Sequence, residues 1–130
     1  MDKSKLLIAF NNHFFEFIDD ILRVFPNDYE LKTAKSILLN LRKSNPKLIL
    51  NIFIEYVLEN FKEEIMDGNI DYFIDKNYKE EFEYIDNVVI EKFNTLKEPI
   101  RKMNNEDKNK VIKYMQNLIK LSEIYKINSV

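Results

Sequence analysis

The side chains that could do chemistry gather first around a single histidine. His13 is followed by Glu16 three residues later and by Asp20 four residues after that, so on a helix the three share one edge. An imidazole beside two carboxylates could relay a proton or contribute to a metal site. Di-iron bundles use Glu-x-x-His pairs from two helices, whereas this chain has neither that order here nor a second histidine. We predict that His13 bridges core and solvent, with a small carboxylate-bridged metal protein as an alternative.

A second candidate site begins at Asp67. Asp67, Asn69 and Asp71 match the first, third and fifth ligand positions of an EF-hand loop. Tyr72 stands where that loop needs glycine, and Tyr78 stands where it needs a bidentate glutamate, so we predict a turn instead of a calcium site. The chain also lacks cysteine, a glycine-rich phosphate loop and a serine-nucleophile motif. We therefore expect no enzymatic activity, no cofactor and no metal.

Basic side chains form the third candidate site, a possible surface for anions or nucleic acid. No acidic residue occurs from Leu31 to Ile49, and the basic residues of the helix predicted there lie within about 100° of its circumference. We name the whole set the basic stripe: Lys32, Lys35, Arg42, Lys43 and Lys47. Such a stripe is typical of a surface that faces phosphate or an acidic partner.

Charge is unevenly distributed along the rest of the chain, although the net charge is −2. Twelve acidic residues and three lysines lie between Glu55 and Glu91, and nine basic and four acidic residues then follow up to Lys126. Two interpretations stay open. Either the basic regions face a partner, or the charged faces neutralise one another within the fold, which the sequence pI near 5.5 favours.

Composition and helical periodicity predict the fold. One glycine and three prolines in 130 residues leave little for hairpin turns, and 45% hydrophobic residues argue against disorder. We expect one all-α domain over residues 1–130, an irregular or orthogonal bundle of about five helices. No signal peptide or membrane-spanning run is recognisable, so we expect a soluble intracellular protein that does not insert in a membrane.

Start and stop residues place the elements of this bundle. We expect a first helix from Leu6 that Pro26 ends, and a second that begins at Asn27 or Asp28. The third is expected to have Asn45 as its N-cap and Pro46 in its first turn, and to run to about Met66. After a short piece at Ile70–Lys76, the fourth starts near Tyr78 and is kinked by Pro99 or ends near Lys97, and the fifth starts at Asn104 to Asp107.

The first and third helices have the widest apolar faces, roughly 200° and 280° of the helical wheel. A helix of this kind needs cover on two sides, so we expect these two to lie innermost. Few elements remain to cover both, and the surplus predicts an exposed apolar patch. A two-fold homodimer through the first or third helix follows as an expectation, with a compact monomer as the alternative.

Several segments resemble uncharacterised small helical proteins of nucleocytoplasmic large DNA viruses, of the mimivirus and phycodnavirus group. The resemblance covers roughly residues 10–82 and rests on FNNHFFEFIDDILRVFPND (Phe10–Asp28), LRKSNPK (Leu41–Lys47) and GNIDYFIDKNY (Gly68–Tyr78). It implies a viral setting, in the host cell cytoplasm or the virion, and assigns no residue a role.

These observations lead to a functional hypothesis and its alternatives. We expect a non-enzymatic interaction or structural module of a large DNA virus that acts through protein–protein surfaces. The first alternative is a nucleic-acid-associated protein that uses the basic stripe, and the second is the carboxylate-bridged metal protein introduced above.

Overall fold

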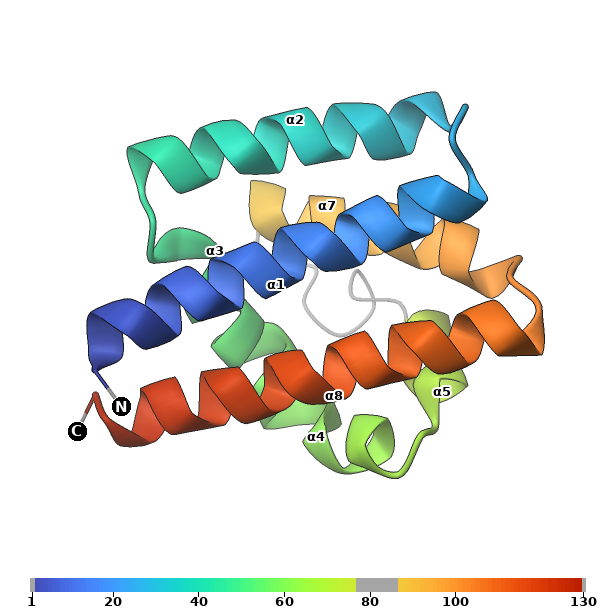
Figure 1. Cartoon of the computed structure of the whole chain (residues 1–130). Helices are drawn as coiled ribbons and strands as arrows, with labels where there is room; N and C mark the ends of the chain where they lie inside the picture. The colour runs from blue at the N-terminus through green and yellow to red at the C-terminus, as the bar shows by residue number, and fades with distance from the viewer. Residues whose placement is uncertain (1, 77–86, 130) are drawn as a thin grey trace.

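The chain folds as a bundle of α-helices (Figure 1). The computed structural model describes residues 2–76 and 87–129, and these residues contain no β-strand. The elements are α1 (Lys3–Val24), α2 (Tyr29–Ser44), α3 (Leu48–Phe53), the π-helical turn η1 (Ile54–Leu58), α4 (Glu59–Met66), α5 (Ile70–Asp75), α7 (Val88–Arg101) and α8 (Asn105–Ile127). The all-α prediction is confirmed.

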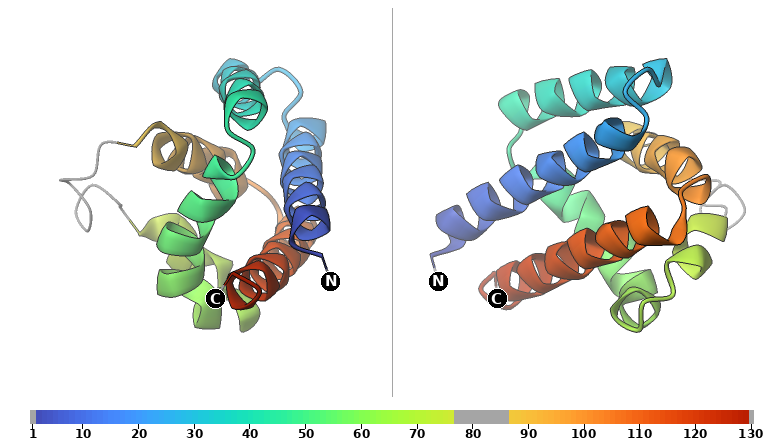
Figure 2. Two further views of the ribbon diagram at one scale, coloured as in Figure 1. Left: turned by 90° about the vertical axis from the view of Figure 1, so that its left-hand side faces the viewer. Right: turned by 45° about the vertical axis from the view of Figure 1, so that its right-hand side comes forward.

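Helices α1 and α8 lie side by side and run in opposite directions, so the two termini meet at one end of the molecule (Figures 1 and 2). Helix α2 turns back along the other side of α1 and also contacts α7. The run from α3 to α4 crosses the bundle beneath these helices, and α5 packs against α4 and α7. Buried side chains come from every one of these helices, so the expectation that the first and third lie innermost stays a prediction.

The predicted start and stop residues mark several helix ends correctly. Asp28 caps α2 by accepting the N–H of Leu31 at 3.1 Å, and Asn104 caps α8 by accepting the N–H of Asp107 at 2.8 Å. Gly68 has a φ of 81° just after α4, the left-handed conformation that a glycine C-cap supplies.

Two predicted boundaries differ from the structure. Asn45 is not the N-cap of the third helix, which begins at Leu48 without a side-chain cap; Asn45 ends α2 by donating its N–H to the Leu41 carbonyl at 2.8 Å, and its carbonyl accepts the N–H of Leu48 at 3.1 Å across the turn that precedes α3. Helix α7 continues past Pro99 to Arg101, so the alternative in which Pro99 ends it near Lys97 is wrong, and the kink stays a prediction; a proline this close to the helix end removes a single hydrogen bond and its fixed φ suits the helix. The predicted start near Tyr78 lies outside the described residues.

The third predicted helix contains a π-helical turn that periodicity did not indicate. In η1 the N–H of Glu59 donates to the Ile54 carbonyl, five residues back. The side-chain amide of Asn60 donates to the carbonyls of Glu55 and Tyr56, at 3.1 and 2.9 Å, so the widened turn keeps its carbonyls paired.

This turn explains how so wide an apolar face is covered. One extra residue rotates the helical surface by about 100°, so the two halves of the run face different neighbours. Helix α3 packs against α1, α2 and α7, whereas α4 packs against α5 and α8. No large hydrophobic side chain between Leu48 and Met66 is exposed. The surplus apolar surface expected on this helix is therefore absent.

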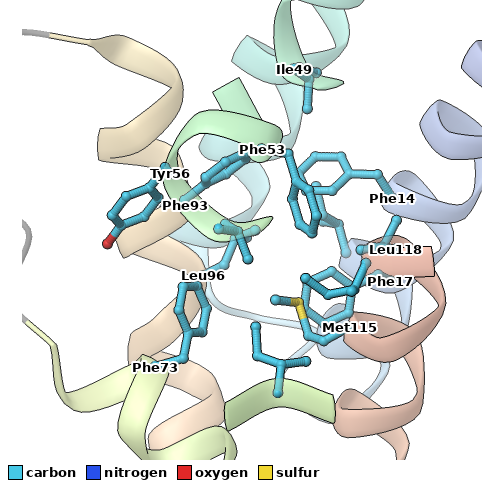
Figure 3. Close-up of a cluster of buried hydrophobic side chains, with 14 of the residues drawn as sticks. Phe14, Phe17, Ile49, Phe53, Tyr56, Phe73, Phe93, Leu96, Met115 and Leu118 are labelled. Atoms are coloured by element: carbon cyan, nitrogen blue, oxygen red, sulfur yellow. The ribbon is translucent and has the colours of Figure 1, made fainter. Parts of the chain in front are cut away.

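Aromatic rings dominate the core (Figure 3). Phe14 contacts the rings of Phe10, Phe15 and Phe93 with centroid distances of 6.2, 5.4 and 5.7 Å. One face of α8 is buried at helical spacing: Val111, Met115, Leu118, Ser122 and Tyr125. The buried faces of α1 and α8 thus follow the helical period.

Candidate functional site

The basic stripe is divided by contacts with α1. Lys35 forms an ion pair with Asp19 at 2.5 Å, and Arg42 donates to the Asn12 side chain at 2.7 Å while lying over the Phe15 ring. The other three members, Lys32, Lys43 and Lys47, are exposed and form no ion pair in the described part of the chain. The surface that remains for a ligand is smaller than the sequence indicated.

Elsewhere the charged faces neutralise one another, as the second interpretation predicts. The acidic middle of the chain meets the basic C-terminal helices through Lys62 with Glu123, Lys126 with Glu59 at 3.1 Å and Lys108 with Asp71 at 3.3 Å. These pairs are at least one-fifth exposed on each side, so each contributes little to stability. None of these three pairs involves α2, where Lys43 forms no ion pair in the described part of the chain.

His13 lies at the boundary between core and solvent, as predicted. Its Nδ1 is 3.6 Å from Glu16, and its ring lies on Tyr114 of α8 with a centroid distance of 5.0 Å. Asp20 turns away from it to pair with Arg23 at 3.2 Å. Because the third carboxylate is used elsewhere, the three side chains do not converge.

The stretch from Asp67 forms a turn between two helices. Asp67 ends α4, and Asn69 caps α5 by accepting the N–H of Tyr72 at 3.3 Å. Across residues 2–76 and 87–129, no three histidine, aspartate or glutamate side chains group so that they could hold a metal ion.

Lys97 of α7 is the residue of greatest chemical interest that the sequence did not single out. Its side chain is buried at 3% exposure, and Nζ donates to the Tyr56 hydroxyl at 2.8 Å and to the Lys76 carbonyl at 3.2 Å. The ammonium lies 4.4 Å from the Phe73 ring centroid and 5.3 Å from that of Tyr56. Tyr56 reaches this position from the π-helical turn, so the widened turn and the buried amine meet.

Burial, together with the nearby positive charge of Arg101, lowers the pKa of Lys97 from 10.5 to about 8. An amine with such a pKa is partly neutral near pH 7 and could act as a nucleophile. The adjoining cavity has a volume of about 20 Å³ and is lined by Phe14, Phe53, Phe93 and Met115. That volume is the size of a single water molecule, so the cavity does not admit a substrate.

A larger concavity lies between α1 and α2. The two helices meet at the Phe25–Asp28 connection and diverge toward the N-terminus of α1 (Figure 1). We name the opening the α1/α2 groove; its volume is about 520 Å³, within the range of roughly 300–1,000 Å³ typical of binding clefts. It is lined by Leu7, Ile8, Asn11, Leu39, Arg42, Lys43 and Pro46.

Two features of this groove are unusual for a plain surface. Ile8 is 56% exposed at its edge and is the one large hydrophobic side chain of α1 that is exposed. Asn11 is 2% exposed and donates to the Pro46 carbonyl at 3.0 Å, but its Oδ1 has no hydrogen-bond partner. An unsatisfied buried acceptor costs about 1–3 kcal/mol. Helical spacing could have indicated Asn11, because on the helical wheel of α1 it lies between Ile18 and Leu22, within the apolar face.

The chain matches no protein-family model, no curated protein and no solved structure. Among the described helices, none is long and apolar enough to cross a membrane.

Proposed function

We propose that this protein is a non-enzymatic helical interaction module that binds a protein partner through the α1/α2 groove. The observation that carries the proposal is the groove itself, which combines an exposed isoleucine and an apolar lining with the unpaired charge of Lys43. Protein interfaces commonly have this arrangement of an apolar centre and a polar rim. The water-sized cavity beside Lys97 supports the non-enzymatic part of the proposal.

Selection from a displayed library of random peptides tests this proposal. We expect peptides that bind the wild-type protein and lose binding to the Ile8→Glu variant, because a charge at the groove edge opposes apolar contact. Tyr29→Glu is the matched control, since Tyr29 is 78% exposed at the far end of α2. A library that yields no peptide dependent on Ile8 would contradict the proposal.

A nucleic-acid-associated protein is the second candidate, favoured by the unpaired lysines of the basic stripe. If it is correct, the triple variant Lys32→Glu, Lys43→Glu and Lys47→Glu loses retention on a polyanion column, because phosphate contacts require these charges. Reversal of three exposed α8 lysines, Lys110, Lys113 and Lys120, is the matched control. Elution of the wild type without retention at physiological salt would remove this candidate.

Three further expectations stay predictions. The two-fold homodimer is one, and the coverage of the third predicted helix removes part of the reasoning behind it. The others are the viral setting and the location in the host cytoplasm or virion, which depend on the resemblance alone.

A further inference from the structure

We infer that the α1/α2 groove receives an acidic amphipathic helix of a partner protein. This inference rests on the proposed function, and it specifies the secondary structure and the charge of the segment that binds.

The walls of the groove favour a helix as the occupant. Both walls are α-helices whose backbone groups are paired internally, so neither offers a sheet edge to which an extended peptide could add. Side-chain packing is then the available mode of recognition. The concavity between the two helices has a volume of about 520 Å³, and a third helix can place residues at i, i+3 or i+4, and i+7 against its lining.

The charge of the groove selects an acidic partner. Arg42 and Lys43 line it, Lys47 lies one residue beyond Pro46, and no acidic side chain lines it. Lys43 and Lys47 have no ion pair in the described part of the chain, so a carboxylate on the incoming helix meets unpaired charge. Such complementarity adds specificity and speeds association.

Two described helices of a second copy do not fit this role. The acidic helix α4 carries Glu63 and Glu64, but its apolar residues Phe61 and Ile65 are buried in the same molecule. The exposed apolar residues at the end of α8, Ile124 and Ile127, flank basic Lys126. We therefore assign the groove to a helix of a different protein.

The test uses fluorescently labelled synthetic peptides of about 14 residues, long enough for four helical turns. One has apolar residues at helical spacing flanked by glutamates, the second has lysine in place of each glutamate, and the third is a scrambled form of the first. We expect the acidic helix to bind at least about ten-fold more tightly than either other peptide in fluorescence anisotropy.

Variants of the full chain locate the binding. Ile8→Glu and Lys43→Glu are each expected to weaken binding of the acidic peptide about ten-fold. Tyr29→Glu and Lys32→Glu, at exposed positions outside the groove, are expected to change it less than about two-fold. Unchanged circular dichroism spectra establish that all variants are folded.

Several results would overturn the inference. Equal binding of the acidic and lysine peptides would show that the groove does not select an acidic segment. Equal binding of the scrambled peptide would show that it does not select an amphipathic helix. Displacement of the acidic peptide by random-sequence duplex DNA, dependent on Lys43 but not on Ile8, would identify nucleic acid as the ligand. A mass by light scattering that rises above 15.7 kDa with concentration, unless Ile8 is replaced, would identify a second copy as the occupant.

Failure of this inference is separable from failure of the proposed function. If the random library yields basic or extended peptides whose binding depends on Ile8, the groove binds protein, but the inference of an acidic helix is wrong. If no selected peptide depends on Ile8, the proposed function and the inference are both wrong.

Discussion

The Phe14→Ala variant is expected to be less stable than the wild type by about 3–5 kcal/mol, the usual cost of removing a buried phenylalanine. Phe14 is 2% exposed and lines the small cavity already present beside Met115. Truncation would enlarge that cavity and remove ring contacts with Phe10, Phe15 and Phe93. Urea unfolding monitored by circular dichroism measures the change.

Glu16→Ala is the control for this prediction. The Glu16 side chain is 65% exposed on the same helix, and its one described contact is with His13 at 3.6 Å. Exposed substitutions of this kind usually change stability by less than about 0.5 kcal/mol. Similar unfolding midpoints for the two variants would mean that the buried face of α1 is assigned wrongly.

The Lys97→Met variant is expected to be more stable than the wild type at pH 7, by about 1–3 kcal/mol. The pKa of Lys97 is lowered from 10.5 to about 8 in the folded chain. Each pKa unit corresponds to about 1.4 kcal/mol, so keeping the charged amine buried costs about 3 kcal/mol below pH 8. Methionine fills similar space without that cost, although the hydrogen bond to the Tyr56 hydroxyl is lost.

The pH dependence of this variant gives the sharper measurement. Between pH 8 and 10.5 the unfolded wild type binds more protons at Lys97 than the folded wild type does, so wild-type stability rises with pH. The advantage of Lys97→Met should therefore shrink by about 2 kcal/mol between pH 7 and pH 9.5. Lys102→Met, at an exposed lysine just after α7, should show no such change. A constant difference between Lys97→Met and the wild type across this range would contradict the lowered pKa.

Residue type predicted helix ends correctly where the capping hydrogen bonds involve only nearby residues. The caps at Asp28, Asn104 and Gly68 depend on backbone groups within a few residues, so residue type predicts them. The predicted cap at Asn45 failed, because Asn45 ends α2 and a turn separates it from the first residue of α3, Leu48. The effect of Pro99 on α7 likewise depends on its distance from the helix end, which residue type alone does not give.

The candidate site was only partly accessible to sequence reasoning. The basic stripe was located correctly on one helix, but which members stay unpaired depends on Asp19 and Asn12, which are far away in the sequence. The sequence did not single out Lys97, because a lysine beside an apolar row normally extends its ammonium into water. Its burial requires a tyrosine hydroxyl and a carbonyl from other helices, and no local pattern encodes them.

The sequence by itself determined the all-α class, the buried faces of α1 and α8 and most helix ends, because hydrophobic periodicity and caps act within a few turns of one helix. The tertiary structure alone decided where α1 and α2 diverge, which lysines keep unpaired charge and how the π-helical turn brings Tyr56 to Lys97. These features depend on contacts between residues distant in the sequence, where packing overrides the preference of any single segment.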